Sequence, residues 1–324
     1  MFVVIVLFLV GLICLIKGGD WFVDGATGIA EKFHLPEILI GATIVSIGTT
    51  LPEMMVSAQA ALAGNGGISY GNAIGSVICN TSLIAAITIA VRPSKVNPKT
   101  IRIPIIAFFV ASIIYCLIAY TSGMFQRWQG IMLLCFFVGY LVFTAVQMKK
   151  MPQSSQQETE NNDQQGKEIS FTKNIVMLIV GAALIAIGAR LLVDNGTKIA
   201  EALGVPSSVI GLTMIALGTS LPELVTAITS LIKGHSSLSL GNIIGANFFN
   251  LACVSGLAIS IRPFNIHMDP SIDVLSSLRV DLPVMLLVML ILSIPSLVKG
   301  KMYKYQGIIL LMIYVAYTAF QFIK

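Results

Sequence analysis

Two stretches of the sequence, GATIVSIGTTLPE at residues 41–53 and GLTMIALGTSLPE at residues 211–223, match each other at a separation of 170 residues. The same shift, without a gap, aligns SYGNAIGSVICN (69–80) with SLGNIIGANFFN (239–250). Chance does not produce an ungapped likeness of this length. The chain is therefore an internal duplication, and this repeat decides the fold assignment.

The composition of the 324 residues excludes a soluble globular protein. Hydrophobic residues make up 56% of the chain and charged residues only 11%, whereas soluble domains carry about 25% charged residues. At about 20 residues for each span, the apolar runs predict an all-α polytopic membrane protein with ten transmembrane helices. The expected spans are residues 2–28, 38–62, 68–91, 102–121, 126–147, 174–193, 207–232, 238–260, 281–298 and 305–323.

One polar segment, residues 151–173, is rich in Gln, Asn and Glu and has nothing to bury, which is typical of a disordered linker. It separates a first five-helix repeat, residues 1–150, from a second one, residues 174–324. Because five is odd, the second copy has to enter the membrane from the opposite side. The sequence thus predicts two inverted five-helix repeats, the architecture of secondary transporters, with the site at mid-membrane where the copies meet.

The distribution of basic residues predicts the orientation. Thirteen of the twenty Lys and Arg follow odd-numbered spans. By the positive-inside rule, the linker then lies in the cytoplasm and both termini lie outside the cytoplasmic membrane. The net charge of +5 comes without a basic cluster that alternates with aromatics, which argues against nucleic acid as a partner. The five dispersed cysteines are interpreted as small buried apolar residues.

Each repeat places one carboxylate deep in an apolar span, Glu53 in the first copy and Glu223 in the second. A charge at that depth costs on the order of 3 kcal/mol by insertion scales. No Lys or Arg lies between Phe33 and Val91, and Lys233 falls at an expected span end. We therefore expect a bound cation or a proton to neutralise the two glutamates.

The neighbours of the glutamates supply oxygen atoms. Residues three and four positions apart share a helix face. Four hydroxyl groups meet this condition: Thr49, Thr50, Thr219 and Ser220. Pro52 and Pro222 lack an N–H group, which frees the carbonyl four residues before each of them. Asp24 and Asp194, which are also related by the repeat, are interpreted as caps or packing groups outside the site.

The following span of each copy adds amides. Asn80 and Asn250 are predicted as ion ligands or as partners of the glutamates, with Ser76 on the same helix stripe as Asn80. Asn72 and Asn242 are predicted to be packing or access-path groups, and the glycines of the two GNxxG motifs to allow close helix approach. Carboxylate, hydroxyl, amide and carbonyl oxygens suit hard ions such as Ca²⁺ and Na⁺.

The paired GTTLPE and GTSLPE segments, each followed by a GNxxG segment that ends in Asn, resemble the two α-repeats of the sodium/calcium exchanger family, within the calcium/cation antiporter superfamily. The likeness is most specific over residues 41–84 and 211–254. It implies a Na⁺/Ca²⁺ antiporter in the lipid bilayer that works by alternating access, with long spans 1 and 6 that slide. Ca²⁺ and Na⁺ are the transported substrates, and no cofactor is expected. Carried over position by position, the family's ligands are Ser46, Thr49, Thr50, Glu53, Ser76, Asn80, Ala216, Thr219, Ser220, Glu223 and Asn250, where Ser46 and Ala216 contribute backbone carbonyls.

The sequence leaves alternatives to this function open. A Ca²⁺(cation)/H⁺ antiporter is the nearest, although proton-coupled relatives usually show a GNxxE-type first motif. Ala246 stands where some relatives have Ser, so one hydroxyl ligand is missing here. Asn250 stands where some relatives have Asp, and an amide at this position argues for potassium independence. A passive channel would conduct without counter-transport. An intramembrane enzyme would need a nucleophile, a dyad or a metal site, and the two acids sit in PE motifs instead of a protease GxGD motif. A monomer is compatible with the sequence.

Overall fold

The computed structural model describes residues 1–150, 171–203, 218–269 and 272–323, and most of these residues are helical. Within this described part, seven helices are long and apolar enough to cross a bilayer, judged by length and composition. The number becomes eight when the bent pair Glu37–Thr49 and Leu51–Ala63 is taken as one span. The chain is thus a helical membrane protein.

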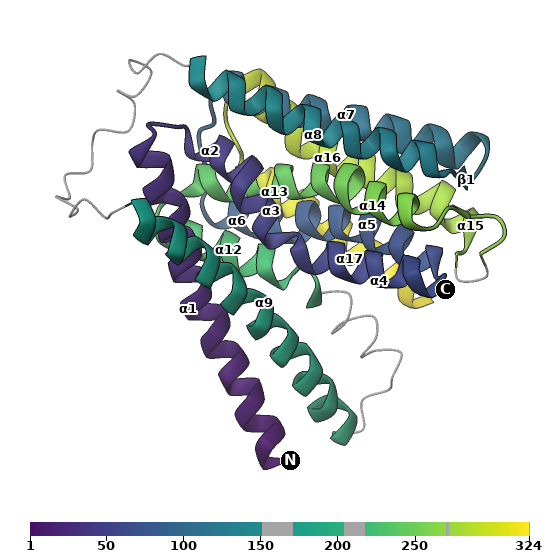
Figure 1. Ribbon diagram of the computed structural model, residues 1–324, viewed down its shortest axis with the longest axis horizontal. Coiled ribbons are helices and arrows are strands. Elements are labelled where there is room, and N and C mark those ends of the chain that lie inside the picture. Colours follow the sequence, from purple (N-terminus) through teal and green to yellow (C-terminus); the bar gives the residue numbers. More distant parts are fainter. Residues whose placement is uncertain (151–170, 204–217, 270–271, 324) are drawn as a thin grey trace.

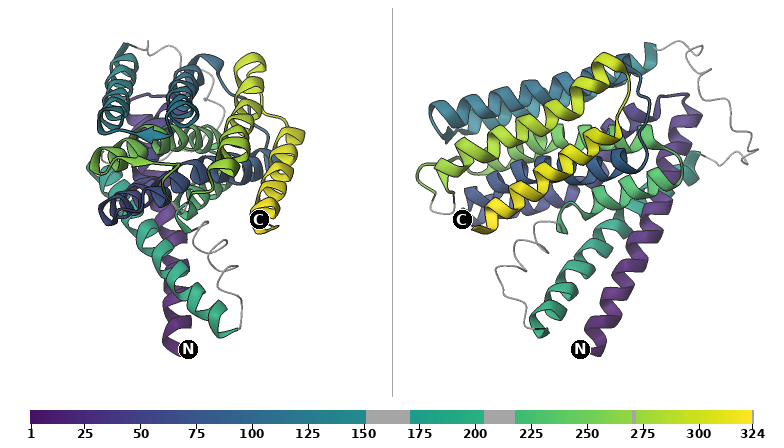
Figure 2. Two further views of the ribbon diagram at one scale, coloured as in Figure 1. Left: turned by 90° about the vertical axis from the view of Figure 1, so that its right-hand side faces the viewer. Right: turned by 180° about the vertical axis from the view of Figure 1, so that it is seen from behind.

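The two longest helices lie side by side and antiparallel, and their far ends project from the rest of the bundle (Figures 1 and 2). They are α1 (Phe2–Lys32) and α9 (Phe171–Ala202). Glycines bring them together: a Cβ atom at Gly18 would lie 3.0 Å from the carbonyl oxygen of Gly181, and one at Gly188 would lie 2.7 Å from that of Gly11. The two helices therefore touch backbone to backbone along this seam.

The first half of the main bundle begins with a helix that bends by 46° at Thr50. Its segments are α2 (Glu37–Ile40), the π-helical η1 (Gly41–Val45), α3 (Ser46–Thr49) and α4 (Leu51–Ala63). The other helices of this half are α5 (Gly66–Cys79), which continues through the π-helical η2 (Asn80–Ala85) into α6 (Ala86–Val91), then α7 (Pro98–Thr121) and α8 (Arg127–Lys150).

The second half of the bundle follows a similar order where it is described, with two additional short segments, α15 and η6, before its fourth helix. Its segments are α12 (Leu221–Ile232), α13 (Ser236–Phe249), the π-helical η5 (Asn250–Val254), α14 (Ser255–Ile261), α15 (Val274–Ser276), the π-helical η6 (Ser277–Asp281), α16 (Leu282–Lys299) and α17 (Lys304–Ile323). A two-residue strand after α7, β1 (Met124–Phe125), pairs antiparallel with β2 (Phe264–Asn265) after α14. This pairing ties the two halves together at one end of the bundle.

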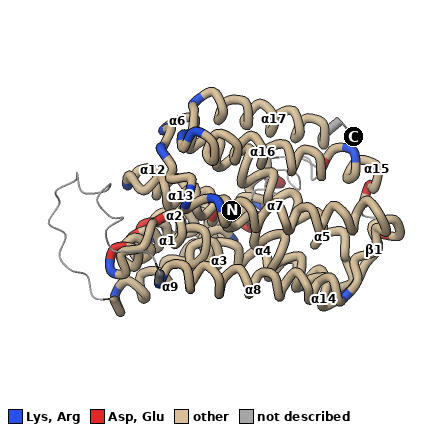
Figure 3. Tube along the Cα trace, turned by 90° about the horizontal axis from the view of Figure 1, so that it is seen from above, with Lys and Arg blue, Asp and Glu red and all other residues tan. Residues whose placement is uncertain are grey.

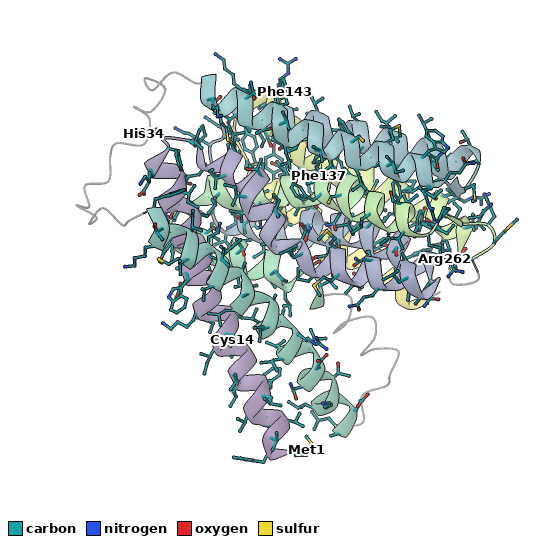
Figure 4. The ribbon with its side chains drawn as sticks, in the orientation of Figure 1. Met1, Cys14, His34, Phe137, Phe143 and Arg262 are labelled. Atoms are coloured by element: carbon teal, nitrogen blue, oxygen red, sulfur yellow. The ribbon has the colours of Figure 1, made fainter. Side chains whose placement is uncertain are left out.

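The core lies around α5 and α13. In the most apolar 18-residue window of each span, the share of buried residues is 72% for α5–α6 and 83% for α13–α14. The share is only 22% for α1 and for α9. Charged residues gather mainly at the two ends of the bundle (Figure 3). His34 marks one of these ends and Arg262 the other (Figure 4).

Nine of the ten expected spans coincide with described helices. The span expected at residues 207–232 coincides with a described helix only over its second half, because residues 207–217 lie outside the described residues. Most of the expected linker, residues 151–170, lies outside them as well. The described helix α9 begins at Phe171 and so includes the last three residues of the expected linker.

Candidate ion-binding site

Both glutamates lie in the first turn of a helix that follows a break. In the first copy, α3 ends at Thr49 and α4 begins at Leu51, with Thr50 between them at φ −85° and ψ 1°. In the second copy, α12 begins at Leu221 after Ser220 at φ −89° and ψ 4°. A proline occupies the first turn of both helices, where a missing N–H is harmless. The two breaks thus share one backbone conformation, and each presents the positive end of a helix dipole to a carboxylate.

The carboxylates of Glu53 and Glu223 are fully buried. In the described part of the chain, no hydrogen bond reaches any of their four oxygens. The two groups also lie close enough to repel each other, and the Thr49 side chain lies beside Glu223. Burying a carboxylate without a partner is expensive. A positive charge bound between the two would remove both the repulsion and the burial cost.

Protein cations do not supply that charge within the described residues. The Nζ atom of Lys233 lies 2.7 Å from Oδ1 of Asp24 on α1, and Arg190 pairs with Asp194 at 3.6 Å on α9. This corrects the interpretation of Asp24 and Asp194 as caps or packing groups, since each carboxylate has a cationic partner. The described residues also hold no cluster of three His, Cys, Asp or Glu that could bind a metal ion. The two glutamates therefore need neutral oxygens to complete an ion site.

Asn80 and Asn250 supply such oxygens. Each is the first residue of a π-helical segment, η2 or η5, and π-helical turns are frequent at functional sites. Both side chains are fully buried, and no amide atom of either has a hydrogen-bond partner among the described residues. The buried Ser220 hydroxyl is unpartnered in the same way, and Ser76 is buried one turn before Asn80. These groups form the oxygen-rich set that a hard cation prefers.

Asn242 belongs to this region although the sequence placed it in packing or an access path. Its Oδ1 accepts a hydrogen bond from the Thr49 hydroxyl at 3.2 Å, and its carbonyl oxygen accepts one from the Ser46 hydroxyl at 3.0 Å. Asn72, its repeat equivalent, bonds instead to Ser57 and to a backbone carbonyl within its own copy. Asn242 therefore joins α13 of the second copy to the broken helix of the first. Counting along one helix could not reveal a contact between two spans.

Of the remaining expected ligands, some are described by the structure and one is not. Ser46 is fully buried, and its carbonyl oxygen accepts hydrogen bonds from the Thr50 backbone at 3.0 Å and hydroxyl at 2.6 Å. Thr219 is half-buried at the second break. Ala216 lies outside the described residues. Whether these groups touch an ion stays a prediction.

Glycines set the distance between the two copies, as expected for the second GNxxG motif. A Cβ atom at Gly241 would lie 2.2 Å from the Ile38 carbonyl oxygen, and one at Gly245 would lie 2.1 Å from the Ser46 hydroxyl oxygen. No described atom lies within 4 Å of a Cβ atom at Gly71 or Gly75. The repeat equivalent of Ile38 is residue 208, which lies outside the described residues, so close approach at the first motif stays a prediction.

The α1 and α9 helices cover the two breaks. A narrow crevice between them and the broken helices is lined by Phe22 and Ile185 on one side and by Thr49, Pro52 and Pro222 on the other. Both prolines of the repeated motifs thus face the same crevice. Residues of α1 and α9 therefore line the same crevice as residues of the two breaks.

Known proteins resemble this chain in sequence. The model of the sodium/calcium exchanger protein family matches residues 3–146 and 173–323. The chain is 31% identical to the sodium/calcium exchanger MaX1 of Methanosarcina acetivorans, over 97% of each chain. It is 36% identical to the putative antiporter CaxA of Alkalimonas amylolytica, over 98% of each chain.

A solved structure of the sodium-calcium exchanger NCX_Mj, soaked without Na⁺ and Ca²⁺, superposes with a TM-score of 0.81 and 31% identity, covering 98% of each chain. The mirrored breaks, the buried glutamates and these matches lead to one assignment. The chain belongs to the sodium/calcium exchanger family, whose members are membrane ion transporters and not enzymes.

Proposed function

We propose that this protein exchanges Na⁺ for Ca²⁺ across the cytoplasmic membrane by alternating access. The observation that carries this proposal is the pair of fully buried carboxylates, Glu53 and Glu223, which have no hydrogen-bond partner among the described residues. Two carboxylates neutralise one Ca²⁺. The same oxygens can hold Na⁺ instead, and this competition for one set of ligands couples the two ions. The names of MaX1 and NCX_Mj support the choice of ions.

The proposed site uses ligands from both copies of the repeat. Glu53 and Glu223 are shared by the two ions, and Asn80 and Asn250 complete the centre from the π-helical segments. The other members of the proposed set are Ser46, Thr49, Thr50, Ser76, Ala216, Thr219 and Ser220. The matching φ and ψ angles at Thr50 and Ser220 support an equivalent role for the two breaks.

The architecture that we propose has ten transmembrane helices in two inverted five-helix repeats, residues 1–150 and 174–324. Residues 151–173 form a cytoplasmic linker, and both termini lie outside. The antiparallel course of α1 and α9 supports the inversion, because these helices begin equivalent halves and run in opposite directions (Figure 1). Sliding of the α1–α9 pair over the two breaks would open the site to alternate sides. The protein acts as a monomer in this proposal.

The test is ion flux in proteoliposomes that contain the purified protein. Vesicles loaded with Na⁺ and diluted into Na⁺-free buffer should take up radioactive Ca²⁺, and vesicles without a Na⁺ gradient should not. A parallel set with a pH gradient and no Na⁺ tests the cation/H⁺ alternative. Uptake driven by protons alone would overturn the choice of Na⁺, and uptake that needs no counter-ion would indicate a channel.

A further inference from the structure

The strongest unexplained feature outside the ion site is the group of charges between α1 and the end of α12. We propose that Lys233 pairs in turn with Asp24 and with Asp20 as α1 slides, so that these three residues set the balance between the two access states. This inference rests on the proposed alternating access and deepens it. It makes the three residues positioning residues, since none of them touches the ion.

The geometry at Lys233 shows one cation shared by two carboxylates. Its Nζ atom lies 2.7 Å from Asp24 Oδ1 and 3.4 Å from Asp20 Oδ1, and it also donates to the Asp20 carbonyl oxygen at 3.1 Å. All three side chains are partly buried, with 25% to 41% of their surface exposed. In this state Asp24 is the closer partner, and Asp20 is already within reach.

The spacing of the two aspartates fits a movement of one helical turn. Asp20 and Asp24 are four residues apart, so they lie on one face of α1 and about 6 Å apart along its axis. A shift of α1 by that length toward its own carboxyl end would bring Asp20 to the place of Asp24. A shift in the other direction would bring Gly28 there, which offers no charge. One-turn steps of packed helices are a known form of conformational switching.

Small residues form the surface over which α1 would move. Gly19 of α1 packs on α12, where a Cβ atom would lie 2.8 Å from side-chain atoms of both Val225 and Thr229. Gly48 of α3 packs on the ring of Phe22 of α1. By contrast, the α1–α9 seam is backbone against backbone. We infer that α1 and α9 move as one body and that the contacts of α1 with α12 and α3 are the ones that change.

The repeat shows that this ion pair is not a requirement of the fold. Asp24 has an equivalent in Asp194, but the equivalents of Asp20 and Lys233 are Arg190 and Ala63. Arg190 and Asp194 pair along α9 and expose 85% and 57% of their side chains. The Asp194 pair therefore links no second helix, and it provides a matched control.

Opposite effects of the two aspartates are the signature of this proposal. Asp24→Asn removes the closer contact in the present state and should favour the shifted state. Asp20→Asn removes the longer contact of the present state, which becomes the close contact after the shift, and should therefore favour the present state. In each variant, the ratio of the shifted to the present population should change about twofold to fivefold, because partly exposed ion pairs are modest in strength. Asp194→Asn should leave the ratio unchanged.

The experiment measures the distance between spin labels by pulsed electron resonance. Labels at Ile5→Cys on α1 and Ile232→Cys at the end of α12 replace exposed side chains, in a background with the five native cysteines changed to alanine. Ile5 lies 15 residues before Asp20, so the vector between the labels runs along α1. The shifted state should appear as a population shorter by about 6 Å. Asp24→Asn should enrich it and Asp20→Asn should deplete it.

Two further variants keep the test decisive. Lys233→Met removes the pair in both states, so its ratio should lie between those of the two asparagine variants. The double variant Asp20→Asn, Asp24→Asn should match Lys233→Met, because the three residues act as one unit. Shifts in the same direction for both single variants, or an equal shift for Asp194→Asn, would overturn the proposal. The distances need no transport, so this outcome is separate from a failure of Na⁺/Ca²⁺ exchange in vesicles.

Discussion

The two copies of the repeat are alike where they approach the ion site and different at their ends. At the breaks, the backbone angles of Thr50 and Ser220 agree within 4° in φ and 3° in ψ. At the ends of the following helices, Lys233 binds α1, whereas its equivalent is Ala63. Duplication has thus kept the groups that would hold the ion and varied the ion pairs between the long helices and the bundle. In the proposed mechanism, this difference between the copies would favour one of the two access states.

The largest effect is expected from the residues that the copies share most closely. Glu53→Gln and Glu223→Gln should each lower Ca²⁺ exchange at least about a hundredfold, because each removes a charged ligand worth about 3 kcal/mol. Both variants should fold, since the amide removes a buried charge. Ca²⁺ should raise the melting temperature of the unmodified protein and of neither variant. A variant that keeps exchange would show that the two copies are not equivalent.

The glycine seam between α1 and α9 provides the next test. Gly11→Ala and Gly181→Ala are repeat equivalents, and both new methyl groups would meet backbone atoms, at 3.0 Å and 2.5 Å respectively. Such overpacking costs about 1–3 kcal/mol, and Gly181→Ala should cost more because its contact is shorter. Thermal unfolding in detergent measures the loss.

A matched control for the seam lies on α8. No described atom lies within 4 Å of a Cβ atom at Gly139. Gly139→Ala should therefore be neutral or stabilise the helix by up to about 1 kcal/mol, because alanine is the better helix former. If all three substitutions behaved alike, helix propensity and not the seam would explain the result.

The two GNxxG asparagines sharpen the comparison at the site itself. Asn242→Ala should weaken Ca²⁺ binding about tenfold, because it removes the hydrogen bond that holds Thr49 beside Glu223, worth about 1 kcal/mol or somewhat more. Asn72→Ala removes contacts within one copy and should weaken binding less. The measurement is the Ca²⁺ concentration for half-maximal uptake. Equal effects of the two variants would count against a bridging role for Asn242.

The elements of the site that could be predicted depend on local spacing. The acid, hydroxyls and proline of each motif lie within five consecutive residues, so the sequence placed Glu53 and Thr50 together without knowledge of the fold. Because the motif recurs at residues 211–223, each prediction for the first copy also applied to the second. The burial of the glutamates also followed from the hydrophobicity of their spans.

The contacts that could not be predicted cross between the copies. Asn242 meets Thr49 over a separation of 193 residues, and Lys233 meets Asp24 over 209. Such contacts depend on where one helix crosses another, which no helical period fixes. The π-helical segments at Asn80 and Asn250 also have no signal in the hydrophobic pattern, because a π-turn shifts a helix face by one residue without changing its composition.

The smallest effect is expected from a second polar contact between helices, at the same end of the bundle as Lys233. Nδ1 of His235, just before α13, lies 2.6 Å from Oε1 of Glu37, the first residue of α2. This hydrogen bond raises the pKa of His235 above its usual 6.5, and the nearby Glu31 and Asp24 act in the same direction. The equivalent of His235 in the first copy is Asn65, which does not titrate.

The sign of the pH effect follows from the raised pKa. The bond stabilises the folded protein fully below the usual histidine pKa of 6.5, and this stability is lost as pH rises through the higher folded pKa. The loss should stay below about 1 kcal/mol because the pair is partly exposed. His235→Asn, which introduces the residue of the first repeat, should make the melting temperature less dependent on pH over this range. An unchanged pH profile in that variant would place the titrating group elsewhere, because the tie between α2 and α13 would then not depend on the imidazolium.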